Sequence, residues 1–140
     1  MIKVLTCNEM KTLDYYTCEK KAISSLQLME IAGKKLFNCL KEKVNIEQSN
    51  FEILIVAGLG NNGGDALVVS EHLINDNFNV KIVVIGDLNN LTPETRSVYN
   101  RINNNNTSII NITCESDIKL FYKLVSECNC RWYLWNWLRS

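Results

Sequence analysis

The sequence has no long hydrophobic run, no excess of charge of one sign, and only one proline and one histidine in 140 residues. Its longest apolar runs, 51–58 and 80–86, fall far short of the roughly 20 apolar residues that a membrane-spanning helix needs. The 15 basic and 15 acidic residues cancel, so no net field would draw the chain onto nucleic acid or an anionic membrane. We therefore expect a soluble protein that binds neither nucleic acid nor membrane.

The first residues also lack targeting features. The stretch MIKVLTCNEMK has too few consecutive apolar residues for a signal peptide, and too little Arg and Ser for an obvious transit peptide. We expect a cytoplasmic location, and an organelle form that begins upstream of Met1 stays open.

Six cysteines are scattered along the chain without a secretory signal, which favours reduced thiols over disulfides. Only Cys128 and Cys130 are closely spaced, and the single His72 is far from them, so we expect no zinc site and no catalytic role for the histidine. The cysteines near the N-terminal helices are interpreted as small core residues without a reactive role; they are Cys7, Cys18 and Cys39.

Two capping-box patterns, at 6–9 and 24–27, predict two N-terminal helices. The first would run from about Asn8 to Lys21, and the second would end near Lys43. The second helix is amphipathic. Its predicted buried face comprises Leu26, Met29, Gly33, Leu36, Phe37 and Leu40.

The remainder alternates between buried strands and helices. An apolar strand at 51–58, a helix at 65–75 and a strand at 79–87 make a βαβ unit. Thr92 would cap a helix that begins at Pro93 and runs to about Ile102, followed by a loop at 103–106, a strand at 108–113 and a helix at 116–127. The pattern predicts one α/β domain containing the opening half of a doubly wound sheet.

The loop GLGNNGGD joins the first predicted strand to its helix. Gly58, Gly60 and Gly63 match G-x-G-x-x-G, in which glycines let the backbone approach a pyrophosphate at a helix N-terminus. Asp87 could be the ribose-binding acid of such a site. This fingerprint alone is compatible with a plain dinucleotide-binding Rossmann domain, and equally with a tight turn that needs glycines.

The polar residues of this loop exceed what a turn requires. Asn61, Asn62 and Asp65 are interleaved with Gly63 and Gly64. Amide oxygens are hard ligands for an alkali or alkaline-earth cation, while NH groups can hold phosphate. Asp65 could also act as the N-cap of the following helix.

Three motifs in order carry a family resemblance: MKTLD at 10–14, LMEIAG at 28–33 and GNNGGD at 60–65. Together, over about residues 5–100, they resemble the YjeF N-terminal domain, the family of NAD(P)H-hydrate epimerases. The resemblance implies a three-layer Rossmann-like α/β fold, with a parallel sheet flanked by helices, that forms a homodimer. It also implies interconversion of the R and S forms of hydrated NADH or NADPH, a repair reaction on nicotinamide nucleotides.

The resemblance further implies that the hydrated nucleotide is bound by Asn61, Asn62, Gly63, Gly64 and Asp65, and that Asn62 holds a potassium ion, K⁺. One departure is Ala66, where the family usually has glycine; alanine suits a helix start. The family's candidate acid/base is an aspartate in a later V-D-x-x-[FL]-G-x-G motif. The sequence does not contain this motif, so its catalytic residue is unknown.

The tail CNCRWYLWNWLRS stands where that motif belongs. Tryptophan has the single codon TGG, which begins a glycine codon when read one base later. With AT-rich codons the shifted frame reads AIVDGIYGIG from Cys128 to Trp137, with aspartate at the codon of Arg131. We interpret 1–127 as a partial YjeF N-terminal domain and 128–140 as an out-of-frame tail, from a gene-model error, a missed intron or a real lesion.

Other interpretations of the tail are a membrane-interface anchor and a disordered terminus. If the chain exists as written, we expect an incomplete C-terminal half of the fold, low stability and no epimerase activity. A non-catalytic YjeF-type scaffold of the RNA-decay proteins is an alternative function. The intact loop 61–65 argues against it.

Overall fold

The computed structural model describes residues 5–44, 52–104, 107–127 and 132–135. The described elements follow the predicted order of two helices and then alternating strands and helices. They are α1 (Cys7–Lys21), α2 (Ser25–Val44), β1 (Ile53–Ala57), α3 (Asn61–Asn75), β2 (Val80–Ile85), η2 (Leu88–Asn90), α4 (Pro93–Asn104), β3 (Ile109–Ile112), α5 (Glu115–Glu127) and β4 (Trp132–Trp135). No helix in these ranges is long and apolar enough to span a membrane.

The sheet is parallel, with strand order β3-β2-β1-β4. All five residues of β1 are buried, as expected for a central parallel strand covered on both faces. β2 and then β3 are added on one side of β1, and β4 is added on the other side, so the direction of strand addition reverses between β1 and β4. In open α/β sheets, ligands bind at the carboxyl ends of the strands beside such a switch point, which directs attention to the loop after β1.

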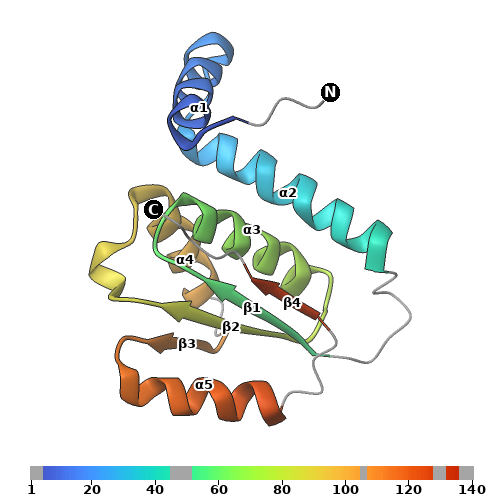
Figure 1. The fold of residues 1–140 in the computed structure, drawn as a ribbon. Helices are drawn as coiled ribbons and strands as arrows, with labels where there is room; N and C mark the ends of the chain where they lie inside the picture. Colours follow the sequence, from blue (N-terminus) through green and yellow to red (C-terminus); the bar gives the residue numbers. More distant parts are fainter. Residues whose placement is uncertain (1–4, 45–51, 105–106, 128–131, 136–140) are drawn as a thin grey trace.

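Helices cover the sheet in layers (Figure 1). α3 and α4 pack on one face, α2 lies outside α3, and α5 lies on the opposite face below β3. The main core lies between the sheet and α3, around Ile55 and Leu67. A smaller core, which contains Leu54 and Val83, lies between the other face of the sheet and α5. The predicted α/β layered architecture is confirmed.

Both predicted capping boxes are present. Thr6 Oγ1 accepts from Glu9 N, and the Glu9 carboxylate accepts from Thr6 N, at 3.3 and 2.8 Å; Ser24 and Gln27 make the corresponding pair at 3.1 and 2.7 Å. Leu36 was assigned to the buried face of the second helix, and this was wrong because its side chain is 48% exposed. The helix buries Met29, Gly33 and Phe37, spaced by four residues, and Leu36 falls beside that stripe.

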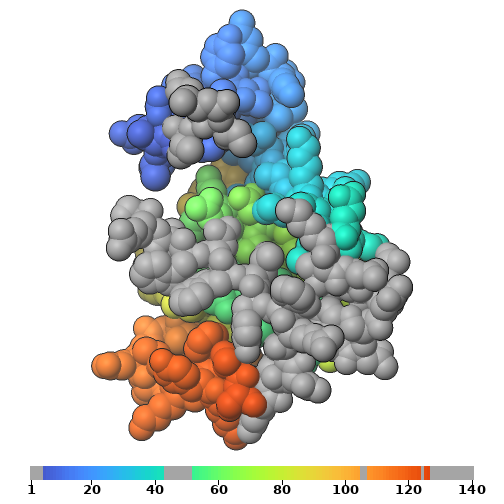
Figure 2. All heavy atoms as spheres, turned by 45° about the vertical axis from the view of Figure 1, so that its right-hand side comes forward, coloured from blue at the N-terminus to red at the C-terminus, as the bar shows by residue number. Residues whose placement is uncertain are grey.

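The core assignment of the N-terminal cysteines was also wrong. Cys7 and Cys39 are exposed and Cys18 is partly exposed, and all three are free thiols. α1 explains two of them: it buries no residue, since it packs mainly on α2 and projects from the end of the molecule opposite α5 (Figure 2).

The structure describes only part of two other predicted segments, the loop at 103–106 and the tail at 128–140. Asn103 and Asn104, assigned to a loop, form the last residues of α4, while 105–106 lie outside the described residues. In the tail, the backbone of 132–135 forms β4 beside β1, with Ile53 opposite Trp132 and Val56 opposite Trp135. The rest of the tail, including Arg131, lies outside the described residues, and its reading frame stays a prediction.

Candidate active site

The polar loop after β1 is the first turn of a helix. Gly60 is the N-cap of α3, with extended backbone (φ −85°, ψ −177°) and no side-chain cap. Asn61 is therefore the first helical residue and Asp65 the fifth. The alternative that Asp65 caps the helix was wrong, because the helix begins four positions earlier than the apolar pattern indicated.

Two glycines of this turn are required by close packing. A Cβ on Gly63 would lie 2.0 Å from the Gly58 carbonyl oxygen, and one on Gly64 would lie 2.4 Å from Met29 Sδ. Both residues are buried in the helix. They bring α3 against its own incoming loop and against α2, and they contribute to the site by position, not by side-chain contact.

The start of α4 holds the same turn from the other side. Thr92 N donates to Leu59 O at 3.1 Å, and Thr92 Oγ1 donates to Asn61 Oδ1 at 2.9 Å. Thr95 Oγ1, fully buried, donates to Gly60 O at 3.1 Å. Sequence reasoning identified Thr92 only as a helix cap and missed these contacts, since they join segments about 30 residues apart.

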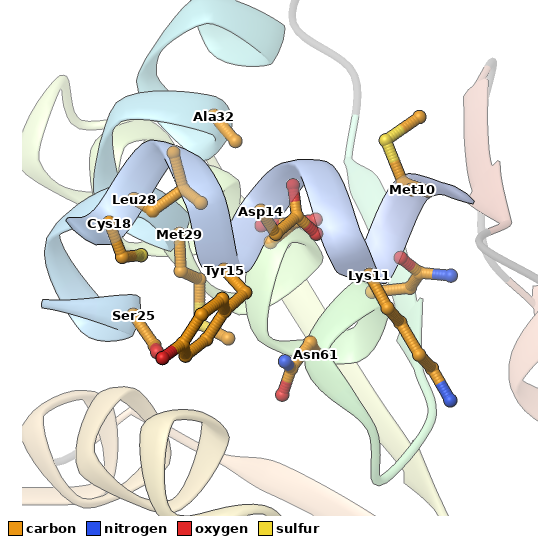
Figure 3. A pocket seen from close by; sticks show the side chains of 12 residues that line it. Met10, Lys11, Asp14, Tyr15, Cys18, Ser25, Leu28, Met29, Ala32 and Asn61 are labelled. Atoms are coloured by element: carbon orange, nitrogen blue, oxygen red, sulfur yellow. The ribbon is translucent and has the colours of Figure 1, made fainter. Parts of the chain in front are cut away.

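A cavity of about 500 Å³ lies between α1, α2 and the start of α3. The three motifs of the sequence meet in its wall: Lys11 and Asp14 from the first, Met29 from the second, and Asn61 with Asp65 from the third. Figure 3 shows the side chains that line it. Convergence of motifs that are separate in sequence on one cavity makes this cavity the candidate binding site.

The structure places the predicted substrate-binding residues in two groups. Asn61, Asn62 and Asp65 line the cavity. Gly63 and Gly64 are buried and do not line it. The sequence had not assigned Tyr15 to the site, yet it lines the same cavity from α1. Tyr15 directly follows Asp14, the last residue of the first motif, and this was the feature of the sequence that could have indicated its place in the site.

The electrostatics of the cavity centre on Asp65. Burial raises the pKa of the Asp65 carboxyl to about 6, and the negative charge of Asp14 adds to this increase. Between described residues, no hydrogen bond involves the Asp65 carboxyl group. Asp65 can therefore take up and release a proton close to neutral pH, as an acid/base group in a site must.

Two polar residues considered from the sequence lie elsewhere. Asp87 is exposed, and its Oδ1 accepts from Asn89 N at 2.9 Å, capping the short helix η2. His72 stacks on Phe37 with ring centroids 5.2 Å apart. Neither side chain lines the cavity of the polar loop, and the observed role of each is local and structural.

The donor set of the cavity fits an alkali cation. Asp14 of α1 and Asn62 and Asp65 of α3 contribute carboxylate and amide oxygens to the cavity lining, and such hard oxygens suit K⁺ better than a soft metal. Within the described ranges, no group of three or more His, Cys, Asp and Glu side chains is arranged to hold a metal ion. A cation here would depend on amide oxygens as well as carboxylates.

Comparison with known proteins identifies the family. The profile of the family described as YjeF-related protein N-terminus matches residues 25–127 of this chain. The chain belongs to the YjeF-related family. The match contains α2, the polar turn of α3 and the following βα units, so the YjeF-related segment includes most of the cavity wall, and α1 adds the remainder.

Curated relatives agree with this assignment. The chain is 40% identical over 87 residues to the NAD(P)H-hydrate epimerase of Lentilactobacillus buchneri, covering 62% of this chain and 40% of the relative. It is 41% identical over 68 residues to the enzyme of the same name from Nitrosopumilus maritimus, covering 48% of this chain and 31% of the relative. The chain thus spans less than half the length of these relatives.

A solved structure confirms the fold. The crystal structure of yeast ynu0, YNL200c, matches with a TM-score of 0.68 and 21% sequence identity. The match covers 86% of this chain and 51% of the yeast chain. The layered α/β arrangement expected from the sequence is therefore that of a known structure.

Proposed function

We propose that this chain provides the nucleotide-binding half of an NAD(P)H-hydrate epimerase, which interconverts the R and S forms of hydrated NADH or NADPH. The observation that carries the proposal is the convergence of the three motifs on one cavity of about 500 Å³ beside the sheet's switch point. Curated relatives that are similar to this chain over 87 and 92 residues are named NAD(P)H-hydrate epimerase, and this supports the assignment.

The chemistry requires one proton to move. The hydrated carbon carries a hydroxyl next to the ring nitrogen; once the hydroxyl is protonated, the nitrogen lone pair expels it as water. Water then returns to either face and loses a proton. Asp65, with a pKa of about 6, is the described group best suited to give and recover that proton. Asn61 and Asn62 would orient the nucleotide beside it.

Potassium is part of the proposal. Asn62 would hold the ion with other oxygens of the same cavity, which Asp14 and Asp65 also line. When bound, the cation would offset the negative charge of carboxylates and phosphates gathered there. The chain's own contribution is to keep the oxygen donors together on α1 and α3.

We also propose a cytoplasmic homodimer. α1 leaves large apolar side chains exposed: Met10 and Leu13 are each 47% exposed, and Tyr16 is 56% exposed. Side chains of this kind on one short helix would be covered by a second copy of the chain. Light scattering of the purified protein tests the dimer, since a monomer at all concentrations would contradict it.

The final part of the proposal concerns the tail. In the restored frame, the apolar residues AIV encoded at 128–130 would form the strand next to β1, so the aspartate encoded at the codon of Arg131 would lie close to the carboxyl end of the sheet. In the 140-residue chain, β4 begins only after this position, at Trp132. The product read in the restored frame is the proposed active enzyme. The 140-residue chain is proposed to be inactive, because it lacks this aspartate, the family's candidate acid/base, with which Asp65 would share the proton transfer.

A binding comparison tests the substrate class. Calorimetric titration with hydrated NADH and with unmodified NADH should show tighter binding of the hydrate, since its ring hydroxyl reaches Asp65 in this account. A plain dinucleotide-binding domain would bind unmodified NADH at least as tightly. The scaffold alternative predicts binding of neither nucleotide.

A further inference from the structure

We propose that Thr92 is a positioning residue for Asn61, and that it fixes the amide of this residue in the orientation that the nucleotide meets. The inference rests on the proposed function for its catalytic consequence. It concerns a residue outside the three motifs, directly before α4, and neither Thr92 nor α4 lines the cavity. The side chain of Thr92 is nevertheless 2.9 Å from Asn61 Oδ1.

Asn61 needs such a partner because it is exposed. It is the first residue of α3 and lines the cavity, and its hydrogen bond with Thr92 is the one that its side chain forms with the described residues. An exposed amide without a partner samples several rotamers, and ordering it on substrate binding costs conformational entropy. Because the hydrogen bond to Thr92 orders the Asn61 side chain when the protein folds, substrate binding no longer has to supply this entropy.

Thr92 is itself held in place by two further contacts, and Thr95, the partner in one of them, is anchored in turn. Its backbone N donates to Leu59 O at 3.1 Å, and its hydroxyl lies 2.8 Å from Thr95 Oγ1. Thr95 is fully buried and reaches Gly60 O at 3.1 Å. The position of Thr92 relative to the α3 turn is therefore determined by backbone and buried groups on both sides.

The hydrogens of this network can be counted. Three short contacts link Asn61 to Thr92, Thr92 to Thr95, and Thr95 to Gly60 O. The two threonine hydroxyls carry only two hydrogens between them, which is one too few for three hydrogen bonds while the Asn61 oxygen faces Thr92. Turning the Asn61 amide by half a rotation would let its NH₂ donate to Thr92, Thr92 to Thr95, and Thr95 to Gly60 O, which gives each contact one hydrogen. In both orientations one end of the amide is held by Thr92, which leaves the other end for the cavity.

Helix capping is the competing explanation for Thr92. Its hydroxyl also accepts weakly from Thr95 N, at 3.4 Å, so a substitution could act through α4 alone. Variants can separate the two effects. Thr92→Val removes the hydroxyl at nearly constant volume, and Thr92→Ser restores it. Ser97→Ala is the matched control, because Ser97 Oγ donates to Pro93 O at 3.0 Å in the same turn of α4 and has no contact with Asn61.

The test has two readouts on the purified protein. The first is ¹⁵N relaxation of the Asn61 side-chain NH₂ without ligand, its signal assigned by its loss in Asn61→Ala. We expect this group to be ordered in the wild type, Thr92→Ser and Ser97→Ala, and mobile in Thr92→Val. The second is the rate of epimerisation of hydrated NADH by the restored-frame chain, which should fall about 10- to 100-fold in kcat for Thr92→Val alone, with a smaller change in KM.

The outcomes are distinguishable. An ordered Asn61 side chain in folded Thr92→Val overturns the proposal, and so does an unchanged kcat despite a mobile side chain. Equal loss of order in Ser97→Ala would assign the effect to the helix and also overturn it. A restored-frame chain with no substitution that shows no epimerase activity would remove the proposed function, whereas the relaxation measurement would still decide whether Thr92 positions Asn61.

Discussion

Asp14 of α1 and Asp65 of α3 face one cavity, and the charge of the first raises the pKa of the second. Like charges brought together by folding disfavour the ionised form of at least one of them. The two helices meet through α2, which packs on both. The arrangement keeps a carboxyl that can be protonated at near-neutral pH beside two amides, and it links the first motif of the chain to the third.

Replacement of Asp14 should change the titration of Asp65. In Asp14→Asn, the pKa of Asp65 should fall from about 6, yet stay above its ordinary value of 3.8, because burial is the larger cause of the increase. Carbon-13 NMR titration of the Asp65 carboxyl measures this directly. An unchanged pKa would show that the two carboxyls do not interact.

Asp65 should reduce stability at neutral pH. Its pKa is higher in the folded than in the unfolded chain, so its favourable contribution is complete below about pH 4 and is lost as the pH rises through 6. Asp65→Asn should therefore be more stable than the wild type at pH 8, by on the order of 1 kcal/mol after solvent screening. This gain should disappear at pH 4. Urea unfolding at the two pH values measures both.

Asp117 provides a control of opposite sign. Hydrogen bonds from Thr113 and Cys114 lower the pKa of its carboxyl, so the ionised form is the one that stabilises the fold. Asp117→Asn should reduce stability at pH 8, and the difference from the wild type should shrink as the pH falls through the range where Asp117 is protonated. Parallel pH behaviour of the Asp65 and Asp117 variants would contradict the electrostatic account.

The two glycines at the start of α3 should differ in tolerance. Gly63→Ala places a methyl 2.0 Å from the Gly58 carbonyl oxygen, a backbone atom that cannot move aside, and should cost about 3 kcal/mol or more. Gly60→Ala is the matched control, since a Cβ there meets nothing within 4 Å and costs at most about 1 kcal/mol as a poorer N-cap. Equal effects on the midpoint of thermal unfolding would contradict the close approach.

Sequencing of the transcript tests the interpretation of the tail. Across the codons for 127–140 and beyond, the account predicts a message that reads AIVDGIYGIG and continues in that frame. A transcript that encodes CNCRWYLWNWLRS and stops would contradict it. The epimerase assignment would then describe an ancestor of this protein.

The sequence predicted most of the fold because its signals are local. Capping boxes at Thr6 and Ser24, Pro93 at a helix start and unbroken apolar strands all depend on neighbours in the chain. Failures came where tertiary packing decides. Leu36 is exposed because the neighbouring stripe of α2 faces α3, and α3 begins at Asn61 because buried glycines allow a helical turn that contains no apolar side chain.

The candidate site was predicted in part for the same reason. Asn61, Asn62 and Asp65 could be chosen from their chemistry, because amides and a carboxylate in a glycine turn exceed what the turn needs. The contributions of Tyr15 and Thr92 depend on which helices meet in space. No local pattern encodes that information in a single sequence.

The most direct measurement of the central claim is the rate at which R and S forms of hydrated NADH equilibrate, followed by chromatography from a pure epimer. The restored-frame protein should accelerate equilibration above the spontaneous rate, and Asp65→Asn should reduce this acceleration at least about tenfold. The 140-residue chain should show none. If the restored-frame protein leaves the spontaneous rate unchanged, the epimerase assignment is wrong.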